Sequence, residues 1–350
     1  MQLTENQPLA PFTTLGIGGP ARWFAEARSE DDVAEACEWA RGRDVPLFVL
    51  GGGSNVLISD DGFPGLVLHI GLMGTSWDGD VLRAAAGVPW EHCVQQTIER
   101  NCAGMECLAG IPGTVGGTPV QNVGAYGQEV SSVIERVRVF DIGTQKFIAF
   151  SAAECGFSYR RSRFNTRDRG RFIVTRVDYR LSVDGKPTVR YPDLARALME
   201  TEQPSLAEVA AAVRRIRQNK GMLLVQGDPN CRSAGSFFKN PVVAKEQISA
   251  IAEGSTGLSW TKDPPHFPAE PGMVKLSAAW LIEEAGFYRG YRLGRAGISR
   301  RHTLALVNYG DADEGGASAT EILSLAQKIA DAVEAKFGVR LEMEPEKIGF

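Results

Sequence analysis

The chain has 350 residues, of which 43% are hydrophobic and 23% are charged, and its formal net charge is -4. This length suits about two domains, and the composition is that of a globular protein with a core. The weakly acidic balance argues against a nucleic acid as the main partner, because phosphate backbones are bound by basic surfaces.

Membrane insertion, disulfides and metal binding also find no support in the sequence. No apolar run approaches the ~20 residues that span a bilayer, and the N-terminal segment lacks the charged and apolar regions of a signal peptide. We therefore expect a cytoplasmic protein without membrane insertion. None of the 6 cysteines forms a C-x-x-C pair, which indicates reduced thiols. The 4 histidines have no metal-ligand spacing, so we expect no metal.

In chain order, the first predicted elements surround a run of glycines. A helix begins at Ser29, because Ser29 and Asp32 have the spacing of a capping pair. The apolar runs Leu47–Leu50 and Leu66–Ile70 are typical of short strands. The segment Pro89–Asn101 has the apolar spacing of a second helix.

The middle of the chain adds two longer strands and another helix. Apolar and charged side chains alternate over Val133–Phe140, and β-branched and aromatic residues dominate Phe172–Val183. Ser205 and Glu208 have the pattern of a capping box ahead of a helix.

Three more elements end the chain. They are a short helix over Ser277–Ala285, a strand over Leu304–Asn308 and a long helix that begins at Ser318 and ends at Gly338. The mixed order of helices and strands, without a regular βαβ repeat, predicts an α+β fold. A polar turn at residues 201–204 marks the predicted domain boundary.

Two glycine-rich segments are candidates for ligand binding. The first, LGGGSNVL over residues 50–57, follows a predicted strand and offers backbone N–H groups to an anion such as pyrophosphate. Its spacing alone favours a tight surface turn. The second, GIPGTVGG over residues 110–117 with its continuation to residue 127, is a long loop of functional or purely structural role. Neither segment is a Rossmann fingerprint or a P-loop.

Three further segments contain candidate catalytic groups. The segment SYRRSRF over residues 158–164 suits a bound carboxylate or phosphate, or a solvated basic turn. In GSFFKNP over residues 235–241, Ser236 is a candidate proton donor, or part of a turn into a strand. The tail LEMEPEK over residues 341–347 fits an exposed edge strand, or one inward glutamate with a perturbed pKa.

The five segments, in this order, resemble those of the UDP-N-acetylenolpyruvoylglucosamine reductases, over nearly the whole chain. The resemblance implies an FAD-binding domain of the vanillyl-alcohol-oxidase type over residues 1–200, in two lobes of about 1–70 and 71–200. It also implies a smaller α+β substrate-binding domain over residues 201–350, whose tail, residues 339–350, returns to the active site.

The family reduces the enolpyruvyl group of a UDP-sugar to UDP-N-acetylmuramate with NADPH and non-covalent FAD, in peptidoglycan precursor synthesis. The implied partners are the UDP-sugar and NADPH, and we expect a monomer. By resemblance, the FAD is lined by Gly51, Gly52, Gly53, Ser54, Asn55, Gly110, Ile111, Pro112, Gly113, Thr114, Gly116 and Gly117.

The resemblance assigns three catalytic residues. Arg160 stabilises the charge that develops on the substrate carboxylate, Ser236 protonates the neighbouring carbon, and Glu344 donates to the same carboxylate. Counting back from the end of the chain selects Glu344, with Glu342 as the alternative. The implied substrate contacts are Tyr126, Tyr191, Lys220 and Asn240.

This sequence departs from the family pattern in three places. The loop between Lys220 and Ser236 is a few residues longer, the tail has Glu344-Pro345-Glu346 where Glu-Val-Arg is common, and His302 replaces a glutamine of some members. Two other functions remain open. One is another flavin oxidoreductase that acts on a small alcohol or sugar, and the other is a flavin- or UDP-sugar-binding protein without activity. GSFFKNP and the C-terminal glutamate argue against the first, and the intact candidate catalytic residues argue against the second.

Overall fold

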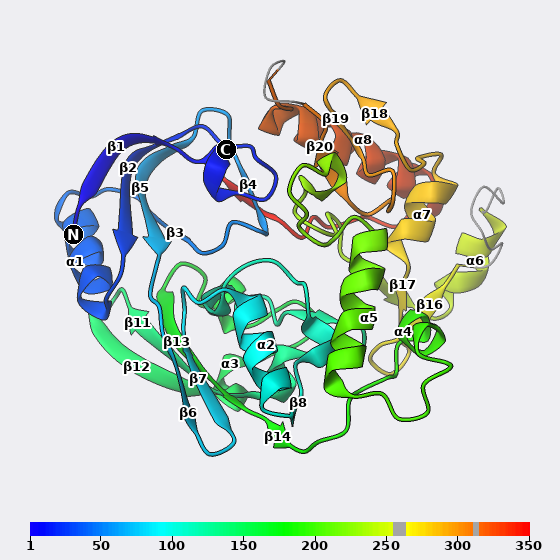
Figure 1. Cartoon of the computed structure of the whole chain (residues 1–350). Coiled ribbons are helices and arrows are strands. Elements are labelled where there is room, and N and C mark those ends of the chain that lie inside the picture. Colours follow the sequence, from blue (N-terminus) through cyan, green and yellow to red (C-terminus); the bar gives the residue numbers. More distant parts are fainter. Residues whose placement is uncertain (255–263, 311–314) are drawn as a thin grey trace. The chain divides into compact units, whose positions relative to one another are not determined.

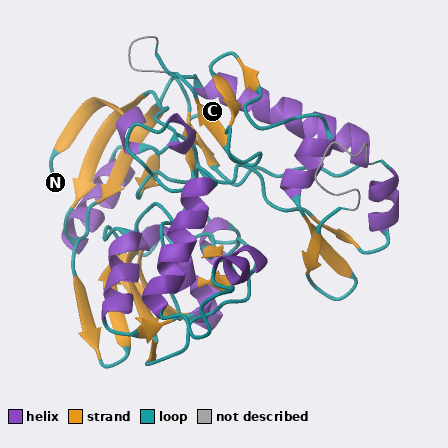
Figure 2. Ribbon diagram, turned by 45° about the vertical axis from the view of Figure 1, so that its right-hand side comes forward, coloured by secondary structure: helices purple, strands orange, loops and turns teal. Residues whose placement is uncertain are grey.

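The computed structural model describes residues 1–254, 264–310 and 315–350. The chain forms two compact units. Unit 1 comprises Met1–Gln7, Ala21–Gly53 and Phe63–Gln218, and unit 2 comprises Pro8–Pro20, Ser54–Gly62 and Asn219–Phe350. Both units mix helices with strands (Figures 1 and 2), which confirms the predicted α+β class. The assignment of cofactor binding to residues 1–200 and of substrate binding to residues 201–350 stays a prediction.

Unit 1 contains two larger sheets. The first has the order β1-β2-β5-β3, with β2 and β3 both parallel to β5, and consists of β1 (Leu3–Pro8), β2 (Pro20–Ala27), β5 (Phe63–Ile70) and β3 (Leu47–Leu50). The second is antiparallel and consists, in spatial order, of β12 (Lys146–Ser151), β11 (Ile134–Asp141), β13 (Phe172–Arg180), β7 (Val81–Ala85) and β6 (Thr75–Asp78). Two short pairs complete the unit: β8 (Cys102–Ala103) with β14 (Ser182–Val183), and β9 (Gly124–Ala125) with β10 (Gln128–Glu129).

The helices of unit 1 are α1 (Glu30–Gly42), α2 (Trp90–Glu99), α3 (Ala152–Cys155), α4 (Pro192–Ala197) and α5 (Leu206–Asn219). Ser29 forms the predicted capping box with Asp32. At the start of α5, the Ser205 hydroxyl accepts from the backbone N–H of Glu208 at 3.3 Å, and the Glu208 carboxylate accepts from the Ser205 N–H at 2.8 Å. These contacts confirm two helix starts predicted from the sequence.

A single apolar core joins both sheets of unit 1 to α1, α2 and α5. Val33 of α1, Val94 of α2 and Val213 of α5 are all fully buried in it. Burial of each such side chain contributes about 1.5–3 kcal/mol. Helices α2 and α5 lie side by side in Figure 1, and an ion pair between Glu91 and Arg214 joins them.

The described residues of unit 2 form three small sheets and three α-helices. The sheets are β15 (Val242–Ala244), β17 (Met273–Leu276) and β16 (His266–Pro268); β18 (Arg292–Leu293), β19 (Ala296–Ile298) and β20 (Leu306–Asn308); and the parallel pair β4 (Val56–Ile58) and β21 (Glu346–Ile348). The helices are α6 (Gln247–Glu253), α7 (Ala278–Glu284) and α8 (Ala319–Phe337).

Two segments from the start of the chain belong to unit 2 because polar contacts and apolar burial hold them there. The fully buried Asn308 side chain, at the end of β20, donates to the Leu15 carbonyl at 3.0 Å. Asp60 accepts from the backbone N–H of Ala319 at 2.7 Å and so caps α8. Leu15 and Leu57 are buried in the same core as α7 and α8.

Several predicted strands differ in their bounds from the observed ones, and two of these differences have a clear cause. The strand predicted over residues 172–183 is interrupted at Leu181, whose N–H donates to the Asp80 carbonyl. Strand β13 pairs with β11 and β7, whereas β14 pairs with β8, so the chain changes partners at this point. The last predicted strand begins at Leu306 instead of residue 304, because the Ala305 N–H closes a turn onto the His302 carbonyl.

Candidate functional site

The two glycine-rich segments meet within unit 1. A Cβ atom added to Gly52 would lie 2.7 Å from the Gly113 Cα atom, and one added to Gly51 would lie 3.0 Å from the Thr114 hydroxyl. Contacts below 3.0 Å between a Cβ and backbone are prohibitive, so only glycine permits this approach at residue 52. The backbone directly after β3 therefore runs against the second loop, which the spacing of the two segments alone did not predict.

The Thr114 hydroxyl is a buried polar atom that finds no hydrogen-bond partner among the described residues. Buried polar groups are normally paired, so an unpaired one indicates a ligand or water. Beside the close backbone approach of the two glycine segments, this unpaired hydroxyl fits a pyrophosphate-bearing cofactor. No histidine lies in either glycine segment, which fits a cofactor that is not covalently tethered.

The second glycine segment is held by the chain between β7 and α2. The Val115 N–H donates to Val88 and the Gly116 N–H donates to the Ala86 carbonyl at 2.8 Å, while the Trp90 N–H donates to the Gly113 carbonyl at 3.0 Å. These bonds fix the backbone on both sides of Thr114. The backbone of the loop is thus tied to the chain between β7 and α2 at three points.

The start of this loop, Gly110, is held at both polar atoms. Its N–H donates to the Glu91 carboxylate at 2.6 Å, and its carbonyl accepts from the Arg217 guanidinium at 3.0 Å. Burial lowers the pKa of Arg217, and the neighbouring Tyr126 and Glu91 oppose that shift. Helices α2 and α5 therefore together fix where the loop begins.

Arg160, the predicted catalytic arginine, has a strained backbone in unit 1. Its φ is +105°, a conformation that non-glycine residues rarely adopt. Its guanidinium donates to the carbonyls of Asn122 (3.1 Å) and Gly124. Asn122 and Tyr126 also have positive φ values, of 46° and 49°. Such strain costs about 1–3 kcal/mol per residue and is concentrated at functional sites.

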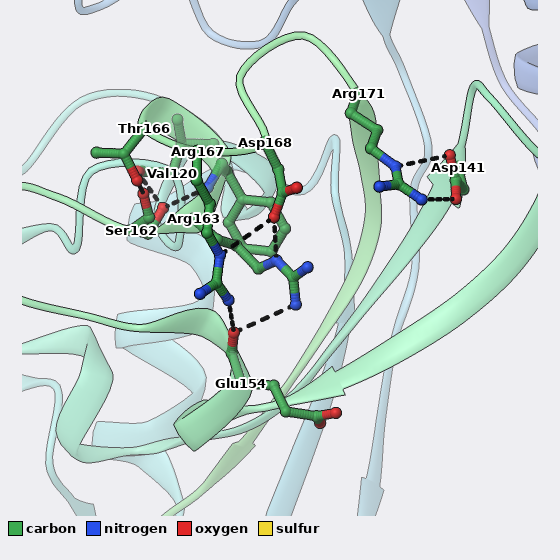
Figure 3. Close-up of polar contacts among 10 residues, drawn as sticks. Val120, Asp141, Glu154, Ser162, Arg163, Thr166, Arg167, Asp168 and Arg171 are labelled. Carbon is green, nitrogen blue, oxygen red and sulfur yellow. Dashed lines mark hydrogen bonds and ion pairs between the residues drawn. The ribbon is translucent and has the colours of Figure 1, made fainter.

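The arginine-rich segment after Arg160 is mainly a structural scaffold. Figure 3 shows Arg163 and Arg167 around Asp168, and both also donate to the Glu154 carbonyl. The Ser162 hydroxyl donates to the Val120 carbonyl at 2.6 Å, which ties this turn to the second glycine loop. Arg160 therefore projects from a braced turn, and Arg163 is a structural residue.

Two predicted substrate residues lie together in unit 1. The Tyr126 and Tyr191 rings meet edge to face with centroids 5.3 Å apart. Tyr126 is 8% exposed, whereas Tyr191, just before α4, is partly exposed. Aromatic pairs of this geometry contribute about 0.5–1.5 kcal/mol. Their substrate contacts stay predictions.

In unit 2, the chain is fixed at Phe237, the residue that directly follows Ser236. The Phe237 N–H donates to the Leu304 carbonyl at 2.7 Å, and the Phe237 and Phe238 rings are each 1% exposed in the core. The aromatic rings therefore anchor the segment, and the Ser236 side chain is half-buried beside them. Its hydroxyl makes no hydrogen bond to another described residue, so it can serve as a donor to a bound group.

The tail pairs with this segment. The Glu344 N–H donates to the Phe237 carbonyl at 2.9 Å, and Phe238 forms an antiparallel bridge with Met343. The Glu344 side chain is half-buried, whereas Glu342 is exposed and faces the Lys239 ammonium at 3.5 Å. This arrangement favours Glu344 over Glu342 as the catalytic candidate, because Glu344 lies opposite the residue next to Ser236.

Lys220 and Asn240, the remaining predicted substrate residues, also belong to unit 2. Lys220 is half-buried and directly follows α5. The side-chain amide oxygen of Asn240 accepts a hydrogen bond from the Ala278 N–H at 2.9 Å. The Asn240 side chain therefore holds the start of α7. His302 accepts from the Leu304 N–H. Arg160 belongs to unit 1, whereas Ser236 and Glu344 belong to unit 2.

Metal-ligand clusters and membrane-spanning helices were not expected from the sequence. Across residues 1–254, 264–310 and 315–350, no group of three or more histidine, cysteine, aspartate or glutamate side chains is placed to hold a metal ion. Within the same residues, no helix is both long and apolar enough to cross a bilayer.

Sequence reasoning missed three residues that organise the site: Glu91, Asn122 and Arg217. Arg217 follows Val213 by four residues and so falls on the apolar face of α5, where a charged residue is unusual. That position was an available signal. Asn122, 1% exposed, donates to Glu129 and to the Ser158 carbonyl, and neither Asn122 nor Glu91 stands out in the sequence.

Comparisons with known proteins agree with this geometry. Residues 21–148 match an FAD binding domain, and residues 228–348 match the UDP-N-acetylenolpyruvoylglucosamine reductase C-terminal domain. The chain is 44% identical to the UDP-N-acetylenolpyruvoylglucosamine reductase of Streptomyces coelicolor, covering 100% of this chain and 91% of that protein. It is 43% identical to the enzyme of that name from Thermobifida fusca, over 99% and 98% of the two chains.

A solved structure extends the likeness to the fold. The crystal structure of UDP-N-acetylenolpyruvylglucosamine reductase from Thermus caldophilus is 28% identical, with a TM-score of 0.66, over 99% of this chain and 98% of that one. The sequence identity to these enzymes extends over almost the whole chain, and both domain models match it. This chain belongs to the UDP-N-acetylenolpyruvoylglucosamine reductases, the FAD-dependent oxidoreductases of peptidoglycan precursor synthesis.

Proposed function

We propose that this chain reduces the enolpyruvyl ether of UDP-N-acetylglucosamine to UDP-N-acetylmuramate, with NADPH as the electron source. The observation that carries the proposal is the backbone pairing of the tail with the Ser236 segment. This pairing sets a carboxyl group, Glu344, opposite the neighbour of a half-buried hydroxyl, Ser236. A carboxyl and a hydroxyl on adjacent segments suit a reaction that needs a proton and a stabilised carboxylate.

The chemistry that FAD would supply here is hydride transfer from NADPH to the terminal carbon of the enolpyruvyl double bond. The glycine segments around Gly52 and Thr114 would hold the pyrophosphate of FAD. They combine a close approach of two backbones with the unpaired, buried Thr114 hydroxyl. The remaining chemistry is assigned to side chains.

The carbon adjacent to the carboxylate gains a proton from the Ser236 hydroxyl, which recovers one from solvent. The substrate carboxylate gains negative charge before that proton arrives. Arg160 neutralises this charge, and Glu344, in its carboxylic acid form, donates a hydrogen bond to it. One hydride and one proton are thus added across the double bond, and NADPH is oxidised to NADP⁺.

Substrate binding is assigned to Tyr126, Tyr191, Lys220 and Asn240. Lys220 supplies a cation for a phosphate, Asn240 supplies an amide, and the Tyr126–Tyr191 pair supplies aromatic edges and phenol groups. We further propose a cytoplasmic monomer whose partners are the UDP-sugar and NADPH, without nucleic acid.

A steady-state assay in air tests the proposal. NADPH consumption should depend on the enolpyruvyl UDP-sugar, and the product should contain one added hydride and one added proton. An oxidase of a small alcohol or sugar, the alternative function, would consume oxygen with its own substrate and show no dependence on the UDP-sugar. A protein that only binds flavin or UDP-sugar would show no turnover in either case.

A further inference from the structure

We infer that Asn55, at the end of the first glycine segment, is a positioning residue for the tail carboxyl Glu344. This inference rests on the proposed role of Glu344. The family resemblance assigned Asn55 to the cofactor, and the contacts within unit 2 also connect it to the tail.

Asn55 holds the tail by two hydrogen bonds. Its side-chain amide donates to the Glu344 carbonyl at 3.2 Å, and its own backbone carbonyl accepts from the Glu346 N–H at 3.0 Å. The residue between them, Pro345, is buried and has no N–H. The two bonds therefore span the proline and fix the chain on both of its sides.

The Glu344 backbone is also held from the opposite direction. Its N–H donates to the Phe237 carbonyl at 2.9 Å. Both backbone polar atoms of Glu344 are thus paired, one to the Ser236 segment and one to Asn55. Because a residue before proline is restricted to extended conformations, Glu344 has little freedom left apart from its side chain.

The parallel pair β4–β21 continues this arrangement. Its register sets Glu346 opposite Val56 and Ile348 opposite Ile58. The chain therefore leaves the glycine segment, passes Asn55 and enters β4 beside the tail. Removal of the Asn55 side-chain amide should keep the β4–β21 register. It would remove one hydrogen-bond donor from the Glu344 carbonyl, so we expect a defect limited to Glu344.

The test compares Asn55→Ala, Glu344→Gln, the double variant and Gln327→Ala as holoenzymes in anaerobic stopped flow. Gln327→Ala is the matched control, because it removes an exposed amide contact on α8 of the same unit. Flavin absorbance per protein reports FAD occupancy. The two rates are flavin reduction by NADPH and flavin reoxidation by the enolpyruvyl UDP-sugar.

We expect Asn55→Ala to keep its FAD, to be reduced at the control rate, and to be reoxidised about 10–100-fold more slowly, since a misplacement of a catalytic group by about 1 Å can cost about 10²-fold. The double variant should be no slower than Glu344→Gln alone, because residues that act through one group are not additive. Asn55→Asp, which keeps the shape and loses the donor, should behave in the same way and replaces Asn55→Ala if that variant does not fold.

Loss of FAD, or equal slowing of both half-reactions, would overturn the inference and return Asn55 to the cofactor site. Independent, multiplicative slowing in the double variant would overturn it as well. Normal reoxidation in Asn55→Ala with slow reoxidation in Glu344→Gln would overturn the inference alone. Normal reoxidation in Glu344→Gln would overturn the proposed role of Glu344 itself.

Discussion

Unit 1 and unit 2 fix their candidate functional groups in different ways. In unit 1 the two glycine segments touch backbone to backbone, with Gly52 against Gly113. Hydrogen bonds from the chain before α2, from α2 and from α5 hold the second segment. In unit 2 the candidate acids lie on segments far apart in the sequence. Glu344 is held by Phe237 and by Asn55, 107 and 289 positions away.

The difference indicates a division of roles. A bound cofactor requires a backbone that can approach it closely, and glycine permits such an approach. Orientation of a single hydroxyl or carboxyl requires a few well-placed hydrogen bonds. Changes in the glycine segments of unit 1 should therefore alter cofactor occupancy, and changes around Ser236 should alter a chemical step without altering occupancy.

The largest effect is expected for Ser236→Ala. Loss of a positioned proton donor should slow flavin reoxidation by the enolpyruvyl UDP-sugar by about 10²-fold or more, with flavin reduction by NADPH unchanged. Anaerobic stopped-flow absorbance measures both rates. Equal slowing of the two half-reactions would show that Ser236 does not act on the substrate, and would remove the contrast between the units.

Gly52→Ala should have the next largest effect, in unit 1. The added methyl group lies 2.7 Å from the Gly113 Cα atom, and backbone cannot move aside as a side chain can. We expect the dissociation constant of FAD to rise about tenfold, since overpacking costs about 1–3 kcal/mol. Flavin fluorescence on titration measures it. Gly42→Ala is the matched control, because no atom lies within 4 Å of its added Cβ; a normal affinity in Gly52→Ala would contradict the close approach.

Asp141→Asn tests the stability of unit 1 apart from function. The Arg171 guanidinium is the main cause that lowers the pKa of Asp141 to about 2, with a further contribution from the Gly143 N–H. This depressed pKa stabilises the fold at pH values above the ordinary pKa of about 3.9 and is lost as the pH falls towards 2.

We therefore expect Asp141→Asn to lower the free energy of unfolding at pH 7 by about 1 kcal/mol, a modest value because the Arg171 side chain is half-exposed. The difference in the free energy of unfolding between Asp141→Asn and the parent protein should disappear between about pH 4 and pH 2. Urea unfolding at a series of pH values measures it, with FAD occupancy at pH 7 as the control. A gap that persists at pH 2 would exclude the ion pair as its cause.

The smallest effect is expected for Glu342→Gln. Glu342 is exposed and its contact with Lys239 is a surface ion pair of 3.5 Å, worth about 0–1 kcal/mol. Flavin reoxidation should change less than about twofold, whereas Glu344→Gln should slow it strongly. A strong effect of Glu342→Gln would assign the catalytic carboxyl to Glu342 and would require another explanation for the pairing of the tail.

Local patterns in the sequence predicted much of the fold. Capping residues such as Ser29 and Ser318 mark helix starts that the structure confirms, since a cap depends only on neighbouring residues. The extent of the strand near Leu181 was mispredicted, because strand ends depend on which distant strand is the partner. The five motifs were enough to identify the family.

The organisation of the site was harder to predict. Nothing in the sequence near Asn55 or Asn308 indicates that their amides hold segments hundreds of positions away. The sequence around Glu91 of α2 likewise does not indicate that this side chain holds Gly110, 19 positions away. Contacts of this kind arise from chain topology, and a single sequence carries no local signal for them. The roles assigned to Arg160, Ser236 and Glu344 come from resemblance and stay predictions.

The visible spectrum of the purified holoenzyme under anaerobic conditions tests the central claim most directly. NADPH is added first and the enolpyruvyl derivative of UDP-N-acetylglucosamine second. We expect the flavin band to bleach with NADPH and to return with the UDP-sugar. A band that bleaches but does not return would contradict the proposed substrate, and the lack of any flavin band in a sample supplied with FAD would contradict the account as a whole.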